Sequence, residues 1–294
     1  MFFDGDTSNK IRHLDIGTAG SVSLVFQTVL PTMLESENNI IQITGGTRVP
    51  YSPLIDYFYR VFLPSSGLDK LFRINVKRHG FFPAGGGCVQ LNRTIEPYKG
   101  VPLTIIEKGE VVSTELMVFS YGKMRNSCQQ VIDLLRIKLK NLYNIEIPDK
   151  NVSQQEFNAK GGAIGAMLIA KTDKGRVLST SLILERNQTF AKFTDELAEN
   201  YAIKCVSSKA CIDDHMADQI LIIMALAEPG SMVRVNHPIS LHAETAIFVI
   251  EEFKPKIKFV IDVDEDESGD SGTCRISCVL RDQGKANILE YDSD

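Results

Sequence analysis

The sequence predicts a mixed α/β protein in which a smaller α+β module interrupts a larger domain. Three observations support this prediction. Strand-like apolar runs such as residues 40–44 alternate with segments of helical period such as residues 22–34. Glycine-rich turns separate them, and the character of the chain changes near residue 107 and again near residue 208. We therefore predict the first part of a large domain over residues 1–106, an inserted domain over 107–208 and the second part of the large domain over 209–294.

The first part shows a strand–helix–strand–helix–strand–strand rhythm, which predicts a sheet of mixed pairing with helices packed on one face. Residues 17–21, rich in glycine and serine, open the first helix, and such a turn suits an anion but equally suits a simple helix cap. Pro53 falls in the first turn of the second helix, where its missing N–H costs nothing. The predicted helices are 22–34 and 52–62, and the predicted strands are 40–44, 72–76 and 88–91.

Residues 78–87, Arg-His-Gly-Phe-Phe-Pro-Ala-Gly-Gly-Gly, are the least random stretch of the chain. A glycine triplet loses more backbone entropy on ordering than any other tripeptide, so the fold must require it. The usual reasons are a positive φ angle or a backbone that lies close to another chain segment or a ligand. A tight turn before the next strand is the simpler interpretation, and both remain open from the residues alone.

The inserted module is predicted from strands at 111–121, 166–171 and 177–184 and helices at 127–142 and 194–200, with a further short strand closing it. Gly162 and Gly165 have the spacing of a phosphate-binding loop, but no Lys-Ser or Lys-Thr follows them. We therefore interpret these glycines as a hairpin or a turn between strands.

In the last part, an apolar helix over residues 220–227 follows Asp214, a suitable N-cap, and has Asp218 and Gln219 at its mouth. A strand at 231–235, a helix reaching residue 253 and strands at 259–263 and 275–280 complete the region. His242 lies at a loop-to-helix junction. A histidine there can act as a nucleophile or general base, or it can be a surface or capping residue.

Composition excludes several classes of protein. The net charge of −5 is not that of a basic nucleic-acid-binding surface, so cationic groups for RNA would have to be local. Part of the net negative charge comes from the acidic run 262–270, which we interpret as a solvated loop between two strands. The six cysteines lack Cys-x-x-Cys spacing, which argues against zinc and redox sites. Without a signal peptide or an apolar run of membrane-spanning length, we expect a soluble protein of the cytosol or nucleus.

Residues 78–87 resemble the signature R-(H/G)-G-(F/Y)-(F/Y)-P-x-G-G-G of the RNA 3'-terminal phosphate cyclase family. Four further segments, in the family's order, strengthen the resemblance. Residues 17–27 resemble its T-A-G-S-x-x-L-x-x-Q segment, and Gly45-Gly46-Thr47 with Pro53 and Tyr57 its G-G-T…P…(F/Y) stretch. Residues 218–227 resemble D-Q-L…M-A-L-A, and residues 241–247 resemble L-H-T-Q-T-A-I. The resemblance covers nearly the whole chain.

The resemblance implies a fold of repeated βαβαββ units with an inserted smaller domain, and an ATP-dependent conversion of an RNA 3'-phosphate to a 2',3'-cyclic phosphodiester. His242 matches the histidine that attacks ATP to form a histidyl-AMP and pyrophosphate. Mg²⁺ or another divalent ion would accompany ATP, RNA 3'-phosphate ends would be the partner, and no membrane is implied. Pro53 and Tyr57 would sandwich the adenine. The implied ATP-binding residues are Gln27, Pro53, Tyr57, His215, Met216, Ala217, Asp218 and Gln219, and those near RNA or its phosphate are Arg78, Gly85, Gly86 and Gly87.

Three departures from the family pattern bear on function. His215 stands where the family usually has Tyr, and Arg48 follows Gly-Gly-Thr where Asp or Asn is usual. The E-G-G-G-Q and R-A-G-R segments of the family are absent, and their arginines would be expected to grip the RNA 3'-phosphate. The alternatives are a non-enzymatic ribosome-assembly or RNA-processing factor, against which the retained His242 argues, and an incomplete product of a cyclase gene. The implied location is the nucleus, either nucleoplasm or nucleolus, or the cytoplasm.

Overall fold

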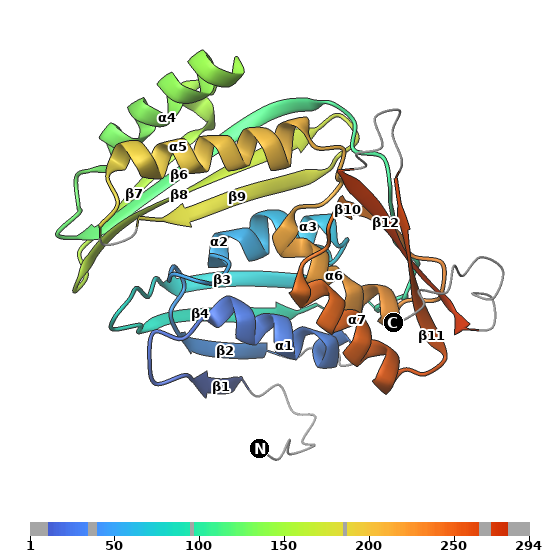
Figure 1. The fold of residues 1–294 in the computed structure, drawn as a ribbon. Coiled ribbons are helices and arrows are strands. Elements are labelled where there is room, and N and C mark those ends of the chain that lie inside the picture. Colours follow the sequence, from blue (N-terminus) through green and yellow to red (C-terminus); the bar gives the residue numbers. More distant parts are fainter. Residues whose placement is uncertain (1–10, 35–39, 95–96, 185–186, 265–271, 282–294) are drawn as a thin grey trace, which may run out of the picture. The chain divides into compact units, whose positions relative to one another are not determined.

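The computed structural model of the protein describes residues 11–34, 40–94, 97–184, 187–264 and 272–281. Within these ranges the chain forms three four-stranded sheets and the helices that pack on them (Figure 1). Its close contacts divide it into two compact units. Unit 1 contains residues 1–98, 114–169 and 179–199, and unit 2 contains residues 99–113, 170–178 and 200–294. This mixed α/β architecture confirms the predicted fold class.

The first sheet, in unit 1, has the strand order β1-β2-β4-β3. β1 runs parallel to β2, while β2 and β3 both pair antiparallel with β4. One helix, α1, connects β1 to β2, and a helical segment made of α2, the π-helical η1 and α3 connects β2 to β3. The elements are β1 (Arg12–Asp15), α1 (Val22–Leu34), β2 (Ile40–Gly45), α2 (Ile55–Tyr57), η1 (Phe58–Phe62), α3 (Leu63–Ser65), β3 (Phe72–Arg78) and β4 (Gly87–Arg93).

The second sheet, in unit 2, repeats this topology with the order β11-β12-β10-β5. β5 is parallel to β10, and both β10 and β11 are antiparallel to β12. Both sheets are therefore βαβαββ units, which confirms the predicted repetition. The elements are β5 (Thr104–Ile105), α6 (Asp214–Leu226), β10 (Met232–Asn236), α7 (Leu241–Phe253), β11 (Ile257–Val263) and β12 (Thr273–Leu280).

The third sheet, of order β7-β6-β8-β9, is built from residues that lie between β5 and α6 in the sequence. The helices α4 and α5 run along it (Figure 1). Its elements are β6 (Val111–Gly122), α4 (Cys128–Tyr143), the 3₁₀ turn η2 (Asp149–Asn151), β7 (Val152–Phe157), β8 (Gly162–Thr172), β9 (Val177–Ile183), α5 (Phe190–Asn200) and the π-helical η3 (Tyr201–Ser207). Most of this sheet clusters with the first repeat in unit 1, so the domain boundaries at 106/107 and 208/209 stay a prediction.

The core of each repeat follows from apolar periodicity. In α1, Val22, Phe26, Leu30 and Met33 are at most 1% exposed, and their spacing of three or four residues places them on one helix face. The Phe26 ring lies 5.8 Å from the ring of Phe58, centroid to centroid, within the core of unit 1. Truncation of such a buried side chain costs about 2–5 kcal/mol of the free energy of unfolding, so this face holds the first repeat together.

Several predicted helix ends differ from the structure. The helical segment after β2 begins at Ile55, which leaves Pro53 in the preceding loop. The helix predicted from residue 194 begins at Phe190, and where a short strand was expected after it, residues 201–207 continue as a π-helix. Propensity marks helix ends weakly, whereas the packing of Phe193, Leu197 and Tyr201 in the core extends this helix. In the described part of the chain, no helix has the length and apolar character needed to cross a membrane.

Candidate functional site

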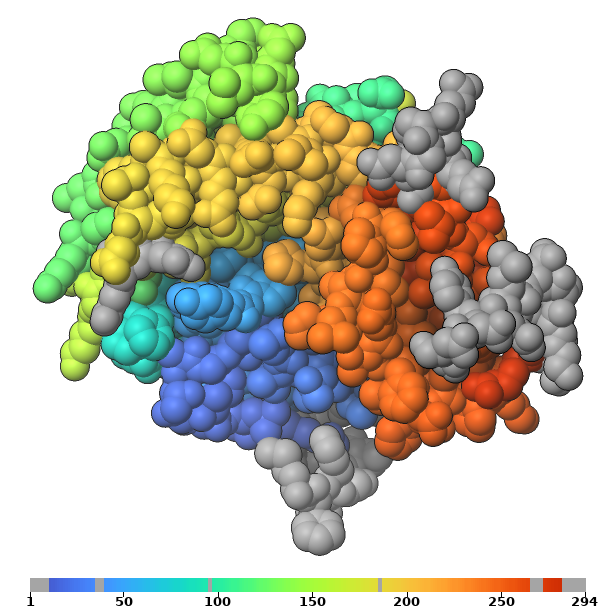
Figure 2. All heavy atoms as spheres, viewed as in Figure 1, coloured from blue at the N-terminus to red at the C-terminus, as the bar shows by residue number. Residues whose placement is uncertain are grey.

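His242 lies in the first turn of α7 in unit 2, and its side chain is exposed. The helix begins after Ser240, whose hydroxyl accepts a hydrogen bond from the Ala243 backbone N–H at 3.2 Å. This cap satisfies one of the free N–H groups that every helix start leaves, so it fixes the first turn and the Cα position of His242. Helices α6 and α7 pack against each other, and both appear in orange at the surface in Figure 2.

The N-cap of the partner helix α6 is Asp213. The predicted cap, Asp214, is instead the first residue of the helix. The Asp213 carboxylate accepts a hydrogen bond from the Met216 backbone N–H at 3.0 Å, and Asp213 has the extended backbone of an N-cap. Asp218 and Gln219 consequently lie within the helix, in its second turn, and not at its mouth.

Asp218 is half-buried, and its Oδ1 atom accepts no hydrogen bond from the described residues. Burial raises the pKa of the Asp218 carboxyl, while the imidazoles of His242 and His215 act in the opposite direction, because a nearby positive charge favours the carboxylate. His215 and Asp218 lie on α6 and His242 on α7, and these two helices pack against each other in unit 2. An unpartnered carboxylate oxygen beside imidazoles can hold a hydroxyl, an N–H group or a cation.

The other predicted residues of α6 are less accessible. Met216 is 0% exposed and Gln219 is 4% exposed, so both side chains face the core of unit 2. Ala217 is 6% exposed and lines a cavity, whereas His215 is exposed. The predicted contacts of the Met216 and Gln219 side chains with ATP stay predictions, and this packing does not favour them.

The cavity that Ala217 lines measures about 630 Å³, a size that suits a small ligand. A polar network forms part of its wall. Lys204 Nζ donates to Asp214 at 2.8 Å, and Asn236 Nδ2 donates to the other Asp214 oxygen at 2.7 Å. Ser240, the cap of α7, also lines the cavity. Lys204 and Asn236 were not predicted, since neither lies in a motif and only the fold joins residues 204, 214 and 236.

The remaining predicted ATP-binding residues, Gln27, Pro53 and Tyr57, belong to unit 1. Gln27 is half-buried on α1, and the Pro53 carbonyl accepts a hydrogen bond from the Ser23 hydroxyl at 2.5 Å. Tyr57 is only 1% exposed, because its ring belongs to the core of the first repeat. Stacking of Tyr57 on adenine would require displacement of packed side chains, so that role stays a prediction which this packing does not favour.

The glycine triplet has a backbone explanation. Gly85 and Gly86 have φ angles of +66° and +72°, which L-residues rarely adopt. A Cβ atom on Gly85 would overlap the carbonyl oxygen of Thr18, and one on Gly87 would lie 2.6 Å from the Gly80 nitrogen. The turn therefore needs both the positive φ and the close approach that the sequence suggested. Arg78 closes it, with Nε donating to the Gly86 carbonyl at 2.6 Å.

Arg48, the departure after Gly-Gly-Thr, is a buried structural residue. It is 1% exposed, and its guanidinium forms a two-point pair with Asp56, from Nε to Oδ2 at 2.7 Å and from Nη2 to Oδ1 at 2.8 Å. Nη2 also donates to Gln155 Oε1 at 2.7 Å, and the guanidinium carbon lies 4.8 Å from the Phe119 ring centroid. Burial by itself would raise the Asp56 pKa, but the hydrogen bond and charge of Arg48 outweigh it and lower that pKa.

Metal binding is limited by the available ligands. Across the described ranges, no group of three or more His, Cys, Asp or Glu side chains could hold an ion. Asp218 offers one unpartnered carboxylate oxygen. Mg²⁺ is commonly bound through one or two carboxylates and the phosphates of its substrate, and Asp218 would supply one such carboxylate.

A family model described as RNA 3'-terminal phosphate cyclase matches residues 1–261. The chain belongs to this family. A protein of Korarchaeum cryptofilum named "RNA 3'-terminal phosphate cyclase" is 32% identical to this chain, over 84% of this chain and 69% of its own length. A protein of Desulfurococcus amylolyticus with the same name is 31% identical, over 85% of this chain and 70% of its own length. A Dictyostelium discoideum protein named "Probable RNA 3'-terminal phosphate cyclase" is 27% identical over 80% of this chain, which spans about half (55%) of that relative.

Membership of the cyclase family confirms the resemblance drawn from the five motifs. In this cyclase-family chain the motifs around Asp218 and His242 converge in unit 2, whereas those around Gln27, Pro53 and the glycine triplet belong to unit 1.

Proposed function

We propose that the chain is an ATP-dependent RNA 3'-terminal phosphate cyclase whose nucleophile is His242. An imidazole nitrogen attacks the α-phosphorus of ATP, the bond to the β-phosphate oxygen breaks, and pyrophosphate leaves. The histidyl-AMP then passes its AMP to the RNA 3'-phosphate. The neighbouring 2'-hydroxyl attacks that activated phosphorus, which forms the 2',3'-cyclic phosphodiester and releases AMP. Membership of the cyclase family supports the overall reaction.

The observation that carries the proposal is the position of His242. It is exposed in the first turn of a helix whose start is held by Ser240, and it acts electrostatically on Asp218 of the adjacent helix. A nucleophile must reach its substrate, which the exposure permits, and it must be held in place, which the cap provides. The positive end of α7 also favours the negative charge that gathers on the α-phosphate during attack.

Asp218 has a separate role in this proposal. Its unpartnered Oδ1 atom accepts a hydrogen bond from a nucleotide hydroxyl or contacts a divalent ion that arrives with the triphosphate. Such an ion, when bound, screens the negative charge of the phosphates. The exposed imidazole of His215, one turn earlier on α6, offers a ring for stacking or a hydrogen bond in place of the tyrosine usual in the family.

The direct test is self-adenylation. The purified chain is incubated with Mg²⁺ and ATP radiolabelled at the α-phosphate, and protein-bound label that is acid-labile and base-stable is measured. We expect label on the wild type, none on His242→Ala, and undiminished label on His13→Ala, which changes another exposed histidine. A second assay supplies an RNA with a 3'-phosphate and measures conversion to a phosphatase-resistant end.

The outcomes separate the possible functions. Equal labelling of the wild type and His242→Ala would show that His242 is not the nucleophile. Absence of label on both proteins, with no phosphatase-resistant RNA, would overturn the enzymatic proposal and favour the non-enzymatic RNA-processing factor.

A further inference from the structure

Three segments of unit 1 meet beside the glycine-rich turn. They are residues 81–87, the end of β6 with the residues that follow it, and the connection from β7 to β8. The Tyr121 hydroxyl donates to the Phe82 carbonyl at 2.9 Å, and the rings of Tyr121 and Phe81 stack with their centroids 4.3 Å apart. The Lys123 backbone N–H donates to the Gly161 carbonyl at 3.1 Å. In each of these contacts, the two residues are about 40 positions apart in the sequence.

Glycines make this meeting possible. A Cβ atom on Gly161 would lie 3.1 Å from the Phe82 carbonyl oxygen and 3.2 Å from Pro83, and one on Gly162 would lie 2.8 Å from the Lys123 nitrogen. Gly161 also has a φ angle of +92°. The spacing of Gly162 and Gly165 that suggested a phosphate loop therefore has a packing reason, since Gly165 in turn lies against the Phe119 ring.

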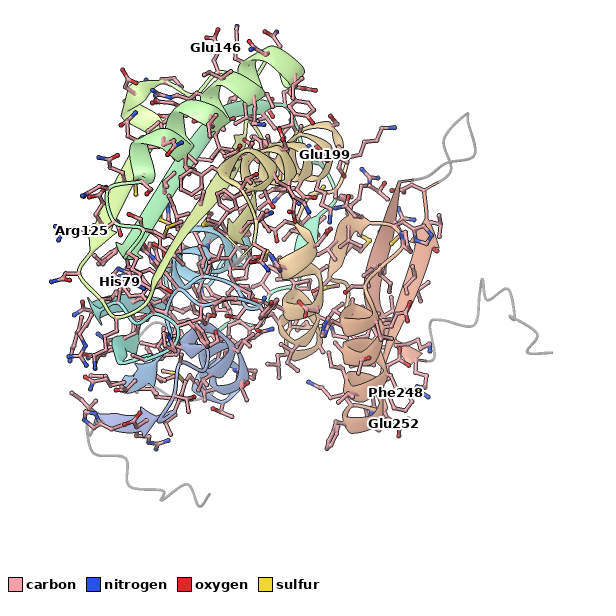
Figure 3. All side chains as sticks on the ribbon, turned by 60° about the vertical axis from the view of Figure 1, so that its left-hand side comes forward. His79, Arg125, Glu146, Glu199, Phe248 and Glu252 are labelled. Carbon is pink, nitrogen blue, oxygen red and sulfur yellow. The ribbon has the colours of Figure 1, made fainter. Side chains whose placement is uncertain are left out.

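Four cationic side chains and one aromatic ring are exposed on these segments and at the end of β3. We call this set the basic edge: Arg78, Phe82, Lys123, Arg125 and Lys160. Phe82 is 53% exposed, so its ring is accessible to a ligand. Figure 3 shows Arg125 at the margin of the unit, on the same side as His79, which lies two residues before the turn.

The charges of the basic edge are not neutralised within the part of the chain that the structure describes. None of its four cations forms an ion pair there, and Arg78 is hydrogen-bonded only to the Gly86 carbonyl. Glu156, an exposed acid on β7, lies opposite Ser120 of β6 in the strand register and forms no ion pair with the basic edge among the described residues. Four free cations gathered in a chain of net charge −5 indicate an anionic ligand.

We propose that the basic edge binds single-stranded RNA, with a base stacked on Phe82 and the backbone phosphates contacted by the four cations. Single-stranded nucleic acid is commonly held by such a combination of positive charge with an exposed aromatic ring. The backbone that carries the ring is held in advance, because the Tyr121 hydroxyl donates to the Phe82 carbonyl and the Gly85 N–H donates to the Phe81 carbonyl at 2.7 Å. The choice of RNA rests on the proposed function, and the exposed ring favours it over an acidic protein.

The test measures RNA binding by the full chain without ATP. Fluorescence anisotropy follows a labelled single-stranded oligoribonucleotide with a 3'-phosphate at several salt concentrations. The variant Lys123→Glu/Arg125→Glu reverses two charges of the edge. Its matched control, Lys70→Glu/Lys192→Glu, reverses two exposed lysines elsewhere in unit 1. Circular dichroism and thermal melting establish that each variant is folded.

We expect Lys123→Glu/Arg125→Glu to weaken binding more than tenfold and to lower the slope of log affinity against log salt by about 1.4, since each phosphate contact with a single strand contributes about 0.7. Phe82→Ala should weaken binding about tenfold without changing the salt slope, because stacking releases no counterions. The control should change affinity by less than threefold.

Binding that is equally strong in the edge variant and the control would overturn the proposal. The proposal would also be overturned if Lys123→Glu/Arg125→Glu lost binding to a polyglutamate peptide but kept its binding to RNA. That result would assign the edge to an acidic protein. The two proposals fail separately. Wild-type self-adenylation without an edge effect on RNA refutes only the basic edge. An edge effect on RNA without self-adenylation refutes only the role of His242.

Discussion

The Nε atom of Arg48 lies 2.7 Å from Oδ2 of Asp56, and neither side chain has any exposed surface. The pair links the loop after β2 to the inserted strands, because Arg48 also donates to Gln155. Asp56 is the second residue of the helix that follows β2, and His242 is the second residue of the helix that follows β10, the corresponding strand of the other repeat. The same topological position thus carries a buried structural carboxylate in one repeat and an exposed imidazole in the other.

Removal of Arg48 should destabilise the protein severely. In Arg48→Met the Asp56 carboxylate is left buried without its cation, and such a loss costs about 3–5 kcal/mol of the free energy of unfolding. Urea denaturation measures the change. The double variant Arg48→Met/Asp56→Leu should be more stable than Arg48→Met, because no charge remains buried. Additive effects of the two substitutions would contradict this interpretation of the pair.

Adjacent glycines should respond differently to alanine. Gly86→Ala places a Cβ in open space and suffers only the positive φ, a cost of about 1–2 kcal/mol. Gly85→Ala suffers the same strain and also overlaps the Thr18 carbonyl, so its cost should be larger. Thermal melting of the two variants compares them directly. Equal melting temperatures would show that the turn does not depend on its close approach to Thr18.

The protein should lose stability at acidic pH because His79 binds a proton more readily in the unfolded chain than in the folded protein. Burial, assisted by the charge of Arg48, lowers the pKa of His79 to about 4, against about 6.5 in an unfolded chain. Between these values the unfolded chain binds the proton first, so stability is unaffected above pH 6.5 and declines as the pH falls toward 4. Melting temperatures of His79→Asn should decline less over this range than those of the wild type.

The exposed histidine variant His13→Asn serves as the control for His79 and should follow the wild-type pH dependence. Parallel curves for the wild type and His79→Asn between pH 7 and pH 4.5 would refute the assignment.

The cap of α7 should matter for both stability and chemistry. Ser240→Ala removes the hydrogen bond from the Ala243 N–H and should cost about 1 kcal/mol. Because the first turn also holds His242, self-adenylation should slow several-fold. Ser153→Ala, which changes an exposed serine on β7, is the matched control and should alter neither quantity. A Ser240→Ala protein that melts and reacts like the wild type would show that the cap does not position His242.

Local patterns predicted much of the fold and part of the site. The helix over residues 22–34 has the bounds of α1, because its apolar residues recur with the helical period and a glycine-rich turn opens it. The loop-to-helix junction at His242 was predicted correctly, since α7 begins at Leu241. The start of α5 at Phe190 and the cap of α6 at Asp213 were predicted wrongly, because both depend on how neighbouring side chains pack.

The sequence by itself determined the alternation of strands and helices, the five motifs and the family, since all of these are properties of short segments read in order. Only the tertiary structure decided that Arg48 is a buried partner of Asp56 and Gln155, that the helices carrying Asp218 and His242 pack together, and that Lys123 and Lys160 join Phe82 at one edge. These groupings join residues 8 to more than 100 positions apart. Burial, charge pairing and close backbone contact select them, and those forces act on distance in space and not on spacing along the chain.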